Sequence, residues 1–351
     1  MIKMAIIGFG GMANWHFENI GKKIPEIKVA AAYDIRQEAK DKIVKSGLKS
    51  YSSPEELYAD GQIDLVLIAT PNDTHMPYAR ACLSAGKHVI CEKPVALNAA
   101  ELAETIEVSR RTGRLFTVHQ NRRWDSDFLT IKKILDDGLL TGPYTIESRV
   151  QGSRQGVFGW RAHKINGGGM LLDWGIHLLD QLLFLFPRKV VSVAAHLHSV
   201  FNPEVDDNFT ALLRFDGGMS ALVNVAMNCF ILQPRWHMCC EDGTAVIENW
   251  ECGGKIVKLK DDAGEMGWAE EIVYTAAGPT RSMAPRPKST TLELPLPLVK
   301  GDWTELYRNI LAALDGKAEL IVKPEQSLRV MKVVDAVFEA DRVGGSLKCE
   351  I

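Results

Sequence analysis

The segment MAIIGFGGMA, residues 4–13, decides the fold of the first third of this chain. Its apolar first half, MAIIG (4–8), predicts a buried strand, and the glycines that follow open a helical stretch. Short apolar runs of the same kind recur, and amphipathic stretches such as 98–111 separate them. These runs are KVAAAYD (28–34), IDLVLIAT (63–70), KHVICE (87–92) and RLFTVHQ (114–120). Strands that alternate with helices in this way predict a parallel sheet of βαβ units that is buried on both faces.

The glycines of this segment form the pattern G-x-G-x-x-A through Gly8, Gly10 and Ala13. The first glycine permits a tight turn, the second lets a pyrophosphate approach the backbone, and the small third residue lets helix and strand pack closely. Unpaired N–H groups at the helix N-terminus then bind the diphosphate. We therefore predict a Rossmann dinucleotide-binding domain, in which Gly11 and Met12 of the same turn also contact the cofactor.

An acidic residue supports this interpretation. Asp34 ends the next predicted strand, 21 positions after Ala13, where a carboxylate accepts hydrogen bonds from the adenosine ribose hydroxyls. The alternative is a solvated aspartate in a turn. Because Asp34 would repel a 2′-phosphate, the sequence favours NAD as the cofactor. Arg36 could accommodate that phosphate, so NADP stays open.

The pattern changes after residue 123. Helices are predicted at 125–136 and 170–186, and two more at 302–314 and 325–342. Between them lie partly alternating runs separated by Gly-rich turns, which predict strands of a meandering sheet. These runs cover 189–200, 209–215, 219–228, 235–240, 244–250 and 255–260. The polar, Pro-rich segment 261–300 is predicted to be loop. The expected fold is α/β, with a Rossmann domain at 1–123 and an α+β domain with a large, mostly antiparallel open sheet at 124–351.

Composition narrows the possible functions. A chain of 351 residues with 46% hydrophobic and 24% charged residues is long enough for two globular domains. A net charge of −3 gives no electrostatic reason to expect nucleic acid or a membrane surface as a partner. The seven cysteines form no CxxC pair, which fits buried thiols in a reducing compartment. With no signal-peptide pattern and no apolar run of membrane-spanning length, we expect a cytoplasmic protein.

Polar residues at two further strand ends are candidates for a ligand site, because ligands bind beyond the carboxyl ends of parallel strands. The run IDLVLIAT leads into residues 71–75, PNDTH, and the run KHVICE leads into Lys93 and Pro94. Asn72 or Asp73 could simply cap the next helix. Lys93 could be a surface lysine, but its position at a strand end makes it a candidate site residue.

The segment Gly167-Gly168-Gly169 and the helix after it carry the strongest signal outside the first domain. Asp173, His177 and Asp180 are spaced four and three residues apart, so a regular helix would align them along one stripe. A carboxylate beside an imidazole can hold its tautomer and raise its basicity, as a general base requires. The alternative is an Asp–His pair on a solvated helix face. The neighbouring leucines and tryptophan predict a largely buried helix, which favours a site.

Other histidines and aromatic residues carry weaker signals. His196 and His198 would share one face of a strand, but no third ligand stands at a suitable spacing, so we predict no metal site. Trp160 lies just before the three glycines and is a candidate substrate contact. The other tryptophans, Trp250 among them, are read as core residues.

Together these motifs resemble those of the Gfo/Idh/MocA oxidoreductases, which include glucose–fructose oxidoreductase and inositol 2-dehydrogenase. The resemblance spans nearly the whole chain. It rests on AIIGFGGMA (5–13), ATPNDTH (69–75), EKP (92–94), QNRRWDSDF (120–128) and GGGMLLDWGIHLLD (167–180). The small departure is Ala13 in place of a third glycine, which the family tolerates.

The resemblance implies roles for individual residues. Lys93 would be the catalytic lysine that contacts the reacting hydroxyl, and His177 the residue that takes its proton. Asp173 would be the partner of His177 or a substrate ligand. Asn121 and Arg122 would line the cleft near the nicotinamide, with Arg122 on the substrate side. Further nucleotide contacts would be made by Gly8, Gly10, Ala13, Asp34, Thr70, Asn72, His75 and Glu92.

The expected function is hydride transfer between nicotinamide and a hydroxyl-bearing carbon of a sugar, cyclic polyol or glycoside. One alternative is an NAD-dependent glycoside-cleaving enzyme that acts through a transient keto-sugar. Another is a non-catalytic regulator that binds NAD(P) as a signal, but such relatives are expected to lose Lys93 or His177. The resemblance also implies a homodimer or homotetramer formed through the C-terminal sheet. The apolar content of residues 189–260 agrees, because exposed apolar sheet faces mark interfaces.

Overall fold

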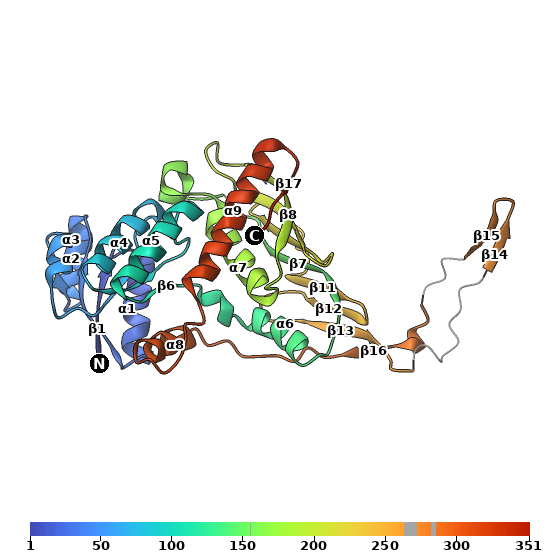
Figure 1. Ribbon diagram of the computed structural model, residues 1–351, viewed down its shortest axis with the longest axis horizontal. Helices are drawn as coiled ribbons and strands as arrows, with labels where there is room; N and C mark the ends of the chain where they lie inside the picture. Colours follow the sequence, from blue (N-terminus) through green and yellow to red (C-terminus); the bar gives the residue numbers. More distant parts are fainter. Residues whose placement is uncertain (155, 263–271, 282–285) are drawn as a thin grey trace.

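The computed structural model describes residues 1–154, 156–262, 272–281 and 286–351. Figure 1 shows two α/β parts side by side, with the N-terminal helices at one end and a broad sheet toward the other. The chain passes from one part to the other after strand β6, close to the predicted boundary at residue 123. We propose 1–123 and 124–351 as the two domains, with two helices of the second packed on the first.

The first sheet has the strand order β3-β2-β1-β4-β5-β6, and all its strand pairs are parallel. Its strands are β1 (Ile2–Ile7), β2 (Ile27–Tyr33), β3 (Lys49–Ser50), β4 (Leu65–Ile68), β5 (His88–Cys91) and β6 (Phe116–Val118). Its helices are α1 (Gly11–Lys23), α2 (Gln37–Lys45), α3 (Pro54–Ala59), α4 (His75–Ser84) and α5 (Ala99–Thr112). The order reverses between β1 and β4, and the crevice at such a point is where open α/β sheets bind ligands. The predicted Rossmann fold is confirmed.

The second sheet has nine strands in the order β16-β13-β12-β11-β7-β10-β9-β8-β17. They are β7 (Pro143–Gln151), β8 (Val190–His198), β9 (Asn208–Phe215), β10 (Ser220–Ala226), β11 (Trp236–Cys240), β12 (Gly243–Ile247), β13 (Gly254–Leu259), β16 (Thr291–Leu294) and β17 (Ser346–Lys348). Among the strand pairs of this sheet in the described residues, β7 and β10 alone are parallel, and β7 lies between β11 and β10. The mostly antiparallel open sheet is confirmed.

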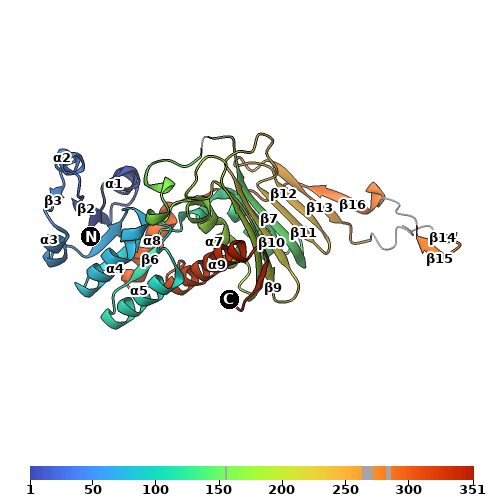
Figure 2. The ribbon, with the colours of Figure 1, turned by 90° about the horizontal axis from the view of Figure 1, so that it is seen from above.

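The second domain also contributes α-helices. They are α6 (Ser126–Asp136), α7 (Ile176–Leu185), α8 (Thr304–Leu314) and α9 (Pro324–Val343). Figure 2 shows α7 and α9 between the first domain and the second sheet, and no helix of the described chain beyond that sheet. Along β9 buried and exposed residues alternate, as they do in a sheet with one covered face. One face of the second sheet therefore stays open.

The segment 261–300 is not simply loop, which corrects the sequence prediction. Residues Thr291–Leu294 form β16, the edge strand, which pairs with β13 through Leu294 and Ile256. Residues Ile272–Thr275 (β14) and Gly278–Arg281 (β15) form a hairpin that Figure 1 shows standing apart from the body. These strands are short and their pairing partners are set by tertiary contacts, which local composition does not reveal. The rest of the predicted loop includes 263–271 and 282–285, outside the described residues.

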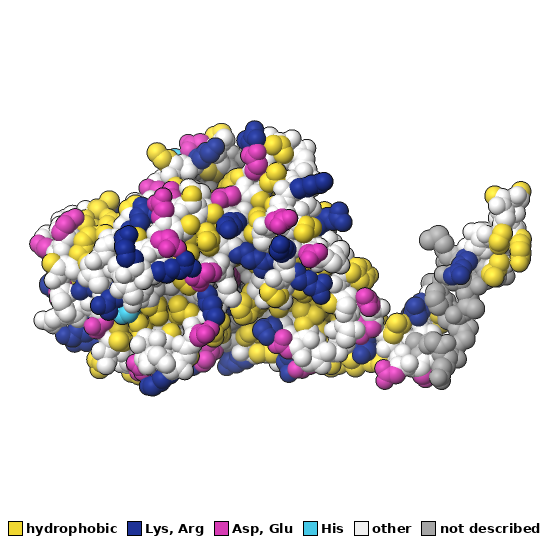
Figure 3. Space-filling model, in the orientation of Figure 1, with side chains coloured by type: hydrophobic (Ala, Val, Ile, Leu, Met, Phe, Trp, Pro, Cys, Tyr) yellow, Lys and Arg dark blue, Asp and Glu magenta, His cyan; other side chains and the backbone are white. Residues whose placement is uncertain are grey.

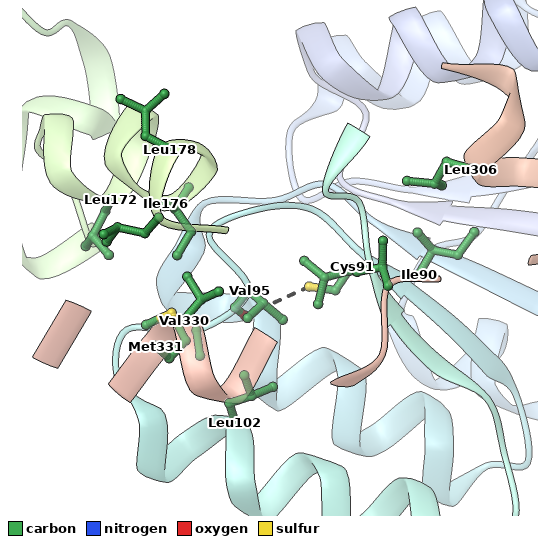
Figure 4. Close-up of a cluster of buried hydrophobic side chains, with 14 of the residues drawn as sticks. Ile90, Cys91, Val95, Leu102, Leu172, Ile176, Leu178, Leu306, Val330 and Met331 are labelled. Carbon is green, nitrogen blue, oxygen red and sulfur yellow. Dashed lines mark hydrogen bonds between the residues drawn. The ribbon is translucent and has the colours of Figure 1, made fainter. Parts of the chain in front are cut away.

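The two domains share one continuous hydrophobic core. Figure 4 draws buried side chains from both, including Ile90 and Leu102 of the first domain with Ile176 and Met331 of the second. Helix α8 also returns to the first domain, where the Tyr307 hydroxyl donates a hydrogen bond to His16 Nδ1 (2.5 Å). This shared core fixes the relative position of the strand ends of the first sheet and of helix α7.

Candidate active site

The glycine turn between β1 and α1 has the geometry expected of a dinucleotide site. Gly8 has a φ of +84°, and a Cβ there would lie 2.7 Å from the carbonyl oxygen of Ala69. Gly10 caps α1 with extended backbone, and no described side chain bonds to the helix N-terminus as a cap. A Cβ on Gly11 would meet no atom within 4 Å. The free N–H groups and open space fit the pyrophosphate of NAD(P).

Asp34 lies beside this turn as predicted, but its carboxylate is already occupied. Oδ2 accepts a hydrogen bond from the Phe9 N–H (2.7 Å), and Oδ1 accepts one from the Arg36 N–H (2.9 Å). The Arg36 guanidinium also bonds both oxygens, each at 3.1 Å. Burial raises the pKa of Asp34, but the bonds from Arg36 and Phe9 outweigh burial and lower it below its usual value. The Arg36 side chain is mostly exposed, so it can move aside for a ribose or bind a 2′-phosphate.

A pocket of about 210 Å³ lies next to this pair. Its lining residues are Phe9, Gly10, Gly11, Asn14, Arg36, Glu38, Ala39 and Lys42. It joins the glycine turn to the basic side chains of α2, so it has the position and chemistry for the adenosine end of the cofactor. Met12, expected to contact the cofactor, is half-exposed on the first turn of α1.

The predicted nucleotide contacts Asn72 and His75 have hydrogen-bond partners within the protein. The Asn72 side chain donates a hydrogen bond to the Gly167 carbonyl (2.8 Å), which ties the first domain to the GGG segment. His75 is fully buried, and its two ring nitrogens lie 2.9 Å from the carbonyls of Thr70 and Pro94. These bonds hold the loops that form the crevice walls. Thr70 lies against the glycine turn, where its methyl group would meet a Cβ on Gly8.

Glu92 was also expected to contact the nucleotide, but it is buried in a hydrogen-bond network. Its Oε1 accepts bonds from His16 Nε2 (2.7 Å) and His119 Nδ1 (3.0 Å), and its Oε2 from the Lys93 N–H (3.1 Å). Burial raises the pKa of Glu92, but the two histidines outweigh burial and hold it well below its usual value. Glu92 is therefore an ionised carboxylate next to Lys93. Its partner His16 accepts a further hydrogen bond from the Tyr307 hydroxyl.

His16, Glu92 and His119 also lie close enough together to be candidate metal ligands. The ligand atoms of His16, Glu92 and His119 lie within 4.8 Å of one another, and the sequence analysis did not consider them together. Both histidines bond to Glu92 Oε1, but His119 Nε2 is buried and has no hydrogen-bond partner among the described residues. His196 and His198, which the sequence analysis weighed as ligands, have stacked rings with centroids 6.0 Å apart on β8.

Lys93 and Asp173 meet across the domain boundary. Lys93 Nζ donates to Asp173 Oδ1 (2.8 Å) and to the Asp173 carbonyl oxygen (3.0 Å). Arg161 Nε lies 3.5 Å from the same Oδ1. Burial raises the pKa of Asp173, but Lys93 and Arg161 together lower it below its usual value. The structure thus brings the predicted lysine and aspartate together as an ion pair.

His177 is buried and bonds to Gln120 rather than to Asp173. Its Nδ1 lies 3.0 Å from Gln120 Oε1. With Nδ1 as the donor, the other ring nitrogen, Nε2, is the proton acceptor. Burial lowers the pKa of His177 well below its usual value, and the charges of Lys93 and Arg122 lower it further. The imidazole is therefore neutral near pH 7, as a general base must be.

The sequence analysis placed Asp173 and His177 along one stripe of a regular helix, but in the structure Asp173 pairs with Lys93 and His177 with Gln120. Residues Leu171–Gly175 form a π-helical turn, and α7 begins only at Ile176. Asp180 is also separate, since it forms a buried ion pair with Arg123 (2.6 Å). Such π turns occur often at functional sites.

The other predicted substrate and cleft residues surround this pair. Arg122 binds Asp125 (2.7 Å), and its guanidinium lies 4.1 Å from the ring centre of Trp174. Trp160 lies under the guanidinium of Arg161 (4.3 Å), which in turn contacts Asp173. Asn121 begins the 3₁₀ turn Asn121–Trp124.

Gln120 was missed by the sequence analysis, although the quoted motif QNRRWDSDF begins with it. A signal was present, because Gln120 ends a predicted strand, where site residues of parallel sheets gather. Trp250 was read as a core residue, yet its ring lies 5.8 Å from that of Trp174 and is 44% exposed.

The fold and the crevice define an NAD-binding oxidoreductase, and comparison with known proteins agrees. The family model GFO_IDH_MocA, described as "Oxidoreductase family, NAD-binding Rossmann fold", matches residues 2–120. The model of the GFO/IDH/MocA C-terminal domain matches residues 128–246. This chain belongs to the Gfo/Idh/MocA family.

Similar proteins are aligned over most of the chain. A solved NAD-binding protein from Listeria innocua is 38% identical, with a TM-score of 0.91 and 99% of both chains covered. The scyllo-inositol 2-dehydrogenase (NADP(+)) IolW of Bacillus subtilis is 28% identical over 82% of this chain and 79% of its own length. The myo-inositol 2-dehydrogenase of Thermotoga maritima is 28% identical over 64% of this chain and 68% of its own. Across the described residues, no helix combines the length and apolar character needed to cross a membrane.

Proposed function

We propose that this oxidoreductase transfers a hydride between nicotinamide and a hydroxyl-bearing carbon of a sugar, cyclic polyol or glycoside. The observation that supports this proposal most directly is the meeting of Lys93, Asp173 and a neutral His177 in the crevice between the domains. A cationic donor beside a neutral base is the pair that alcohol oxidation requires. The named activities of the inositol dehydrogenase relatives support a ring polyol as the substrate.

Each residue has a defined part in the oxidation. His177 Nε2 takes the hydroxyl proton, while the hydrogen bond from Nδ1 to Gln120 keeps the tautomer fixed. The Lys93 ammonium donates to the developing alkoxide, and Asp173 holds that ammonium in place. As the C–O single bond becomes a carbonyl, the carbon loses its hydride. Nicotinamide, when bound, supplies the hydride acceptor.

The test is a screen of cyclic polyols, sugars and glycosides with NAD and with NADP. The proposal expects formation of the reduced cofactor with at least one ring polyol or sugar. A glycoside that releases its sugar without net cofactor reduction would instead favour cleavage through a transient keto-sugar. Tight binding of the cofactor without any turnover across the panel would favour a non-catalytic regulator that binds NAD(P) as a signal.

We also propose that the chain forms a homodimer or homotetramer through the open face of the second sheet. Leu212 on β9 and Tyr144 on β7 are exposed on that sheet. Exposed apolar patches of this kind mark interfaces. Light scattering at micromolar concentration tests this, and a monomer would contradict it.

We also propose a cytoplasmic location. The seven cysteines are all free thiols, as expected in a reducing compartment.

A further inference from the structure

A cluster of tryptophan and arginine side chains adjoins the catalytic histidine. The Trp174 ring centre lies 6.0 Å from that of His177, and the Trp250 ring centre 5.8 Å from that of Trp174. The Arg122 guanidinium lies beside both indoles, 4.1 Å from the ring centre of Trp174 and 5.5 Å from that of Trp250. A continuous row of π surfaces therefore runs outward from His177 to Trp250.

The outer end of this row is open. Trp250 is 44% exposed, whereas Arg235, which lies 4.7 Å from its ring centre, is buried and paired with Asp127. Arg235 and its partner hold the indole from the protein side and leave part of the ring surface facing outward. A large aromatic side chain that is held in place yet exposed beside a catalytic group is typical of ligand recognition.

The sheet topology places Trp250 at the active-site end of the second sheet. Trp236 pairs with Ser148 of β7 and with Ile247 of β12, so these three residues lie in line across the sheet. Because both pairings are antiparallel, β7 and β12 run in the same direction. The chain after β7 leads to the GGG segment, and the chain after β12 carries Trp250. Both segments therefore leave the sheet at the same end.

The loop that carries Trp250 also has an unusual backbone. Cys252 has a φ of +60°, and among the described non-glycine residues it is the one with positive φ. Such a conformation is strained for a residue with a Cβ and persists where the surroundings enforce it. Here the Cys252 N–H donates to the Asn249 carbonyl (3.2 Å), and the Asn249 side chain accepts from the Gly253 N–H (3.0 Å). The loop is thus fixed in a single tight shape around Trp250.

We propose that Trp250, with Arg122 and Trp174, forms the substrate ring platform, which selects a cyclic polyhydroxy compound. The negative face of the indole attracts the polarised C–H groups on the face of a pyranose or cyclitol ring. Arg122 offers N–H donors to the ring hydroxyls at the edge. This inference rests on the proposed function, because the platform presents to His177 the ring that is oxidised.

The test compares Trp250→Ala and Trp250→Phe with the wild type on myo-inositol, D-glucose and methyl β-D-glucoside. For a substrate from this panel, Trp250→Ala should raise KM by about 3–10-fold with kcat within about twofold, and Trp250→Phe should retain part of the affinity. The Kd for NADH should not change. Tyr274→Ala is the matched control, since Tyr274 is an exposed aromatic on the β14–β15 hairpin, and its KM should equal the wild-type value.

A binding measurement separates this inference from the proposed function. With NADH bound, quenching of tryptophan fluorescence by the same three compounds reports binding without turnover. Binding that depends on Trp250 without any oxidation supports the platform and contradicts the proposed reaction. Oxidation with an unchanged KM in Trp250→Ala overturns the platform and leaves the reaction standing. An unchanged KM together with loss of the oligomer identifies Trp250 as a subunit contact, which also overturns the platform. If none of the three compounds is bound or oxidised, both the platform and the proposed reaction are overturned.

Discussion

The glycine turn and the crevice around Lys93 and His177 differ in how far apart in sequence their contacting residues lie. In the glycine turn the contacts join residues close in sequence, such as Phe9 with Asp34, 25 positions apart. In the crevice, His177 bonds to Gln120 over 57 positions and Lys93 to Asp173 over 80. Local geometry sufficed to predict the turn. The crevice depends on how two domains pack, so its residues were found but their partners were not.

The largest expected effect concerns the crevice. Lys93→Ala and His177→Ala should each lower kcat about 10²–10⁴-fold, because each removes a group that acts on the reacting hydroxyl. The Kd for NADH should stay within about threefold of the wild-type value, since the glycine turn is distant in sequence and intact. Lys189→Ala, an exposed surface lysine, is the control. Near-wild-type kcat in either site variant would refute the assignment.

Gly8→Ala tests the glycine turn in the same way. The left-handed backbone costs about 1–2 kcal/mol for any residue with a Cβ, and at Gly8 that Cβ also meets the Ala69 carbonyl and Thr70. We expect a loss of roughly 3 kcal/mol in the free energy of unfolding, measured with urea, and weaker NADH binding. Gly47→Ala is the matched control, because Gly47 has a φ of +74° and no atom within 4 Å of its Cβ position. Equal losses in the two variants would show that close packing at Gly8 is unimportant.

The partners of the catalytic pair should show smaller effects. Gln120→Ala leaves the His177 Nδ1 without its acceptor, and we expect kcat to fall about tenfold. Asp173→Asn removes the charge that holds Lys93 and should lower kcat by a similar factor. If Asp173 instead held the substrate directly, its variant would cost as much as Lys93→Ala, and KM would rise.

The pH profile tests the electrostatics of the crevice. Because the pKa of His177 is lowered from 6.5, the neutral base persists to lower pH, and kcat/KM should begin to fall only below that value. Arg122 lowers this pKa, so Arg122→Gln should move the acidic limb to higher pH. Glu92 raises it, so Glu92→Gln should move the limb to lower pH. Shifts of the opposite sign would contradict the assignment of the limb to His177.

Cofactor preference is the smallest expected effect, and it tests the glycine turn, whose contacts join residues close in sequence. Asp34 should make NAD preferred over NADP, as judged by kcat/KM for the two cofactors. Asp34→Ser releases Arg36 from its carboxylate partner, so the variant should favour NADP by about tenfold more than the wild type does, since tenfold is about 1.4 kcal/mol. A wild-type preference of tenfold or more for NADP would mean that Arg36 governs this position.

The fold was predictable because it depends on repeated local patterns, and the site was predictable only in part. Apolar runs and turn glycines identified the Rossmann sheet and most strands of the second sheet. The β14–β15 hairpin and β16 carried too little pattern to predict. At the site, Lys93 and His177 were found from strand ends and helix spacing, but spacing did not reveal that Asp173 pairs with Lys93 and His177 with Gln120. Burial of Glu92 and exposure of Trp250 depend on tertiary packing, which spacing does not encode.

The most direct test of the central claim follows the transferred hydrogen. A ring polyol from the screen, deuterated at each carbon that bears a hydroxyl, is incubated with the enzyme and its preferred oxidised cofactor, and the reduced cofactor is analysed by mass spectrometry. Direct transfer from the substrate carbon predicts one deuterium in each molecule of reduced cofactor, with formation slowed about 10²–10⁴-fold in His177→Ala. Reduced cofactor without deuterium would contradict direct hydride transfer in the Lys93–His177 crevice.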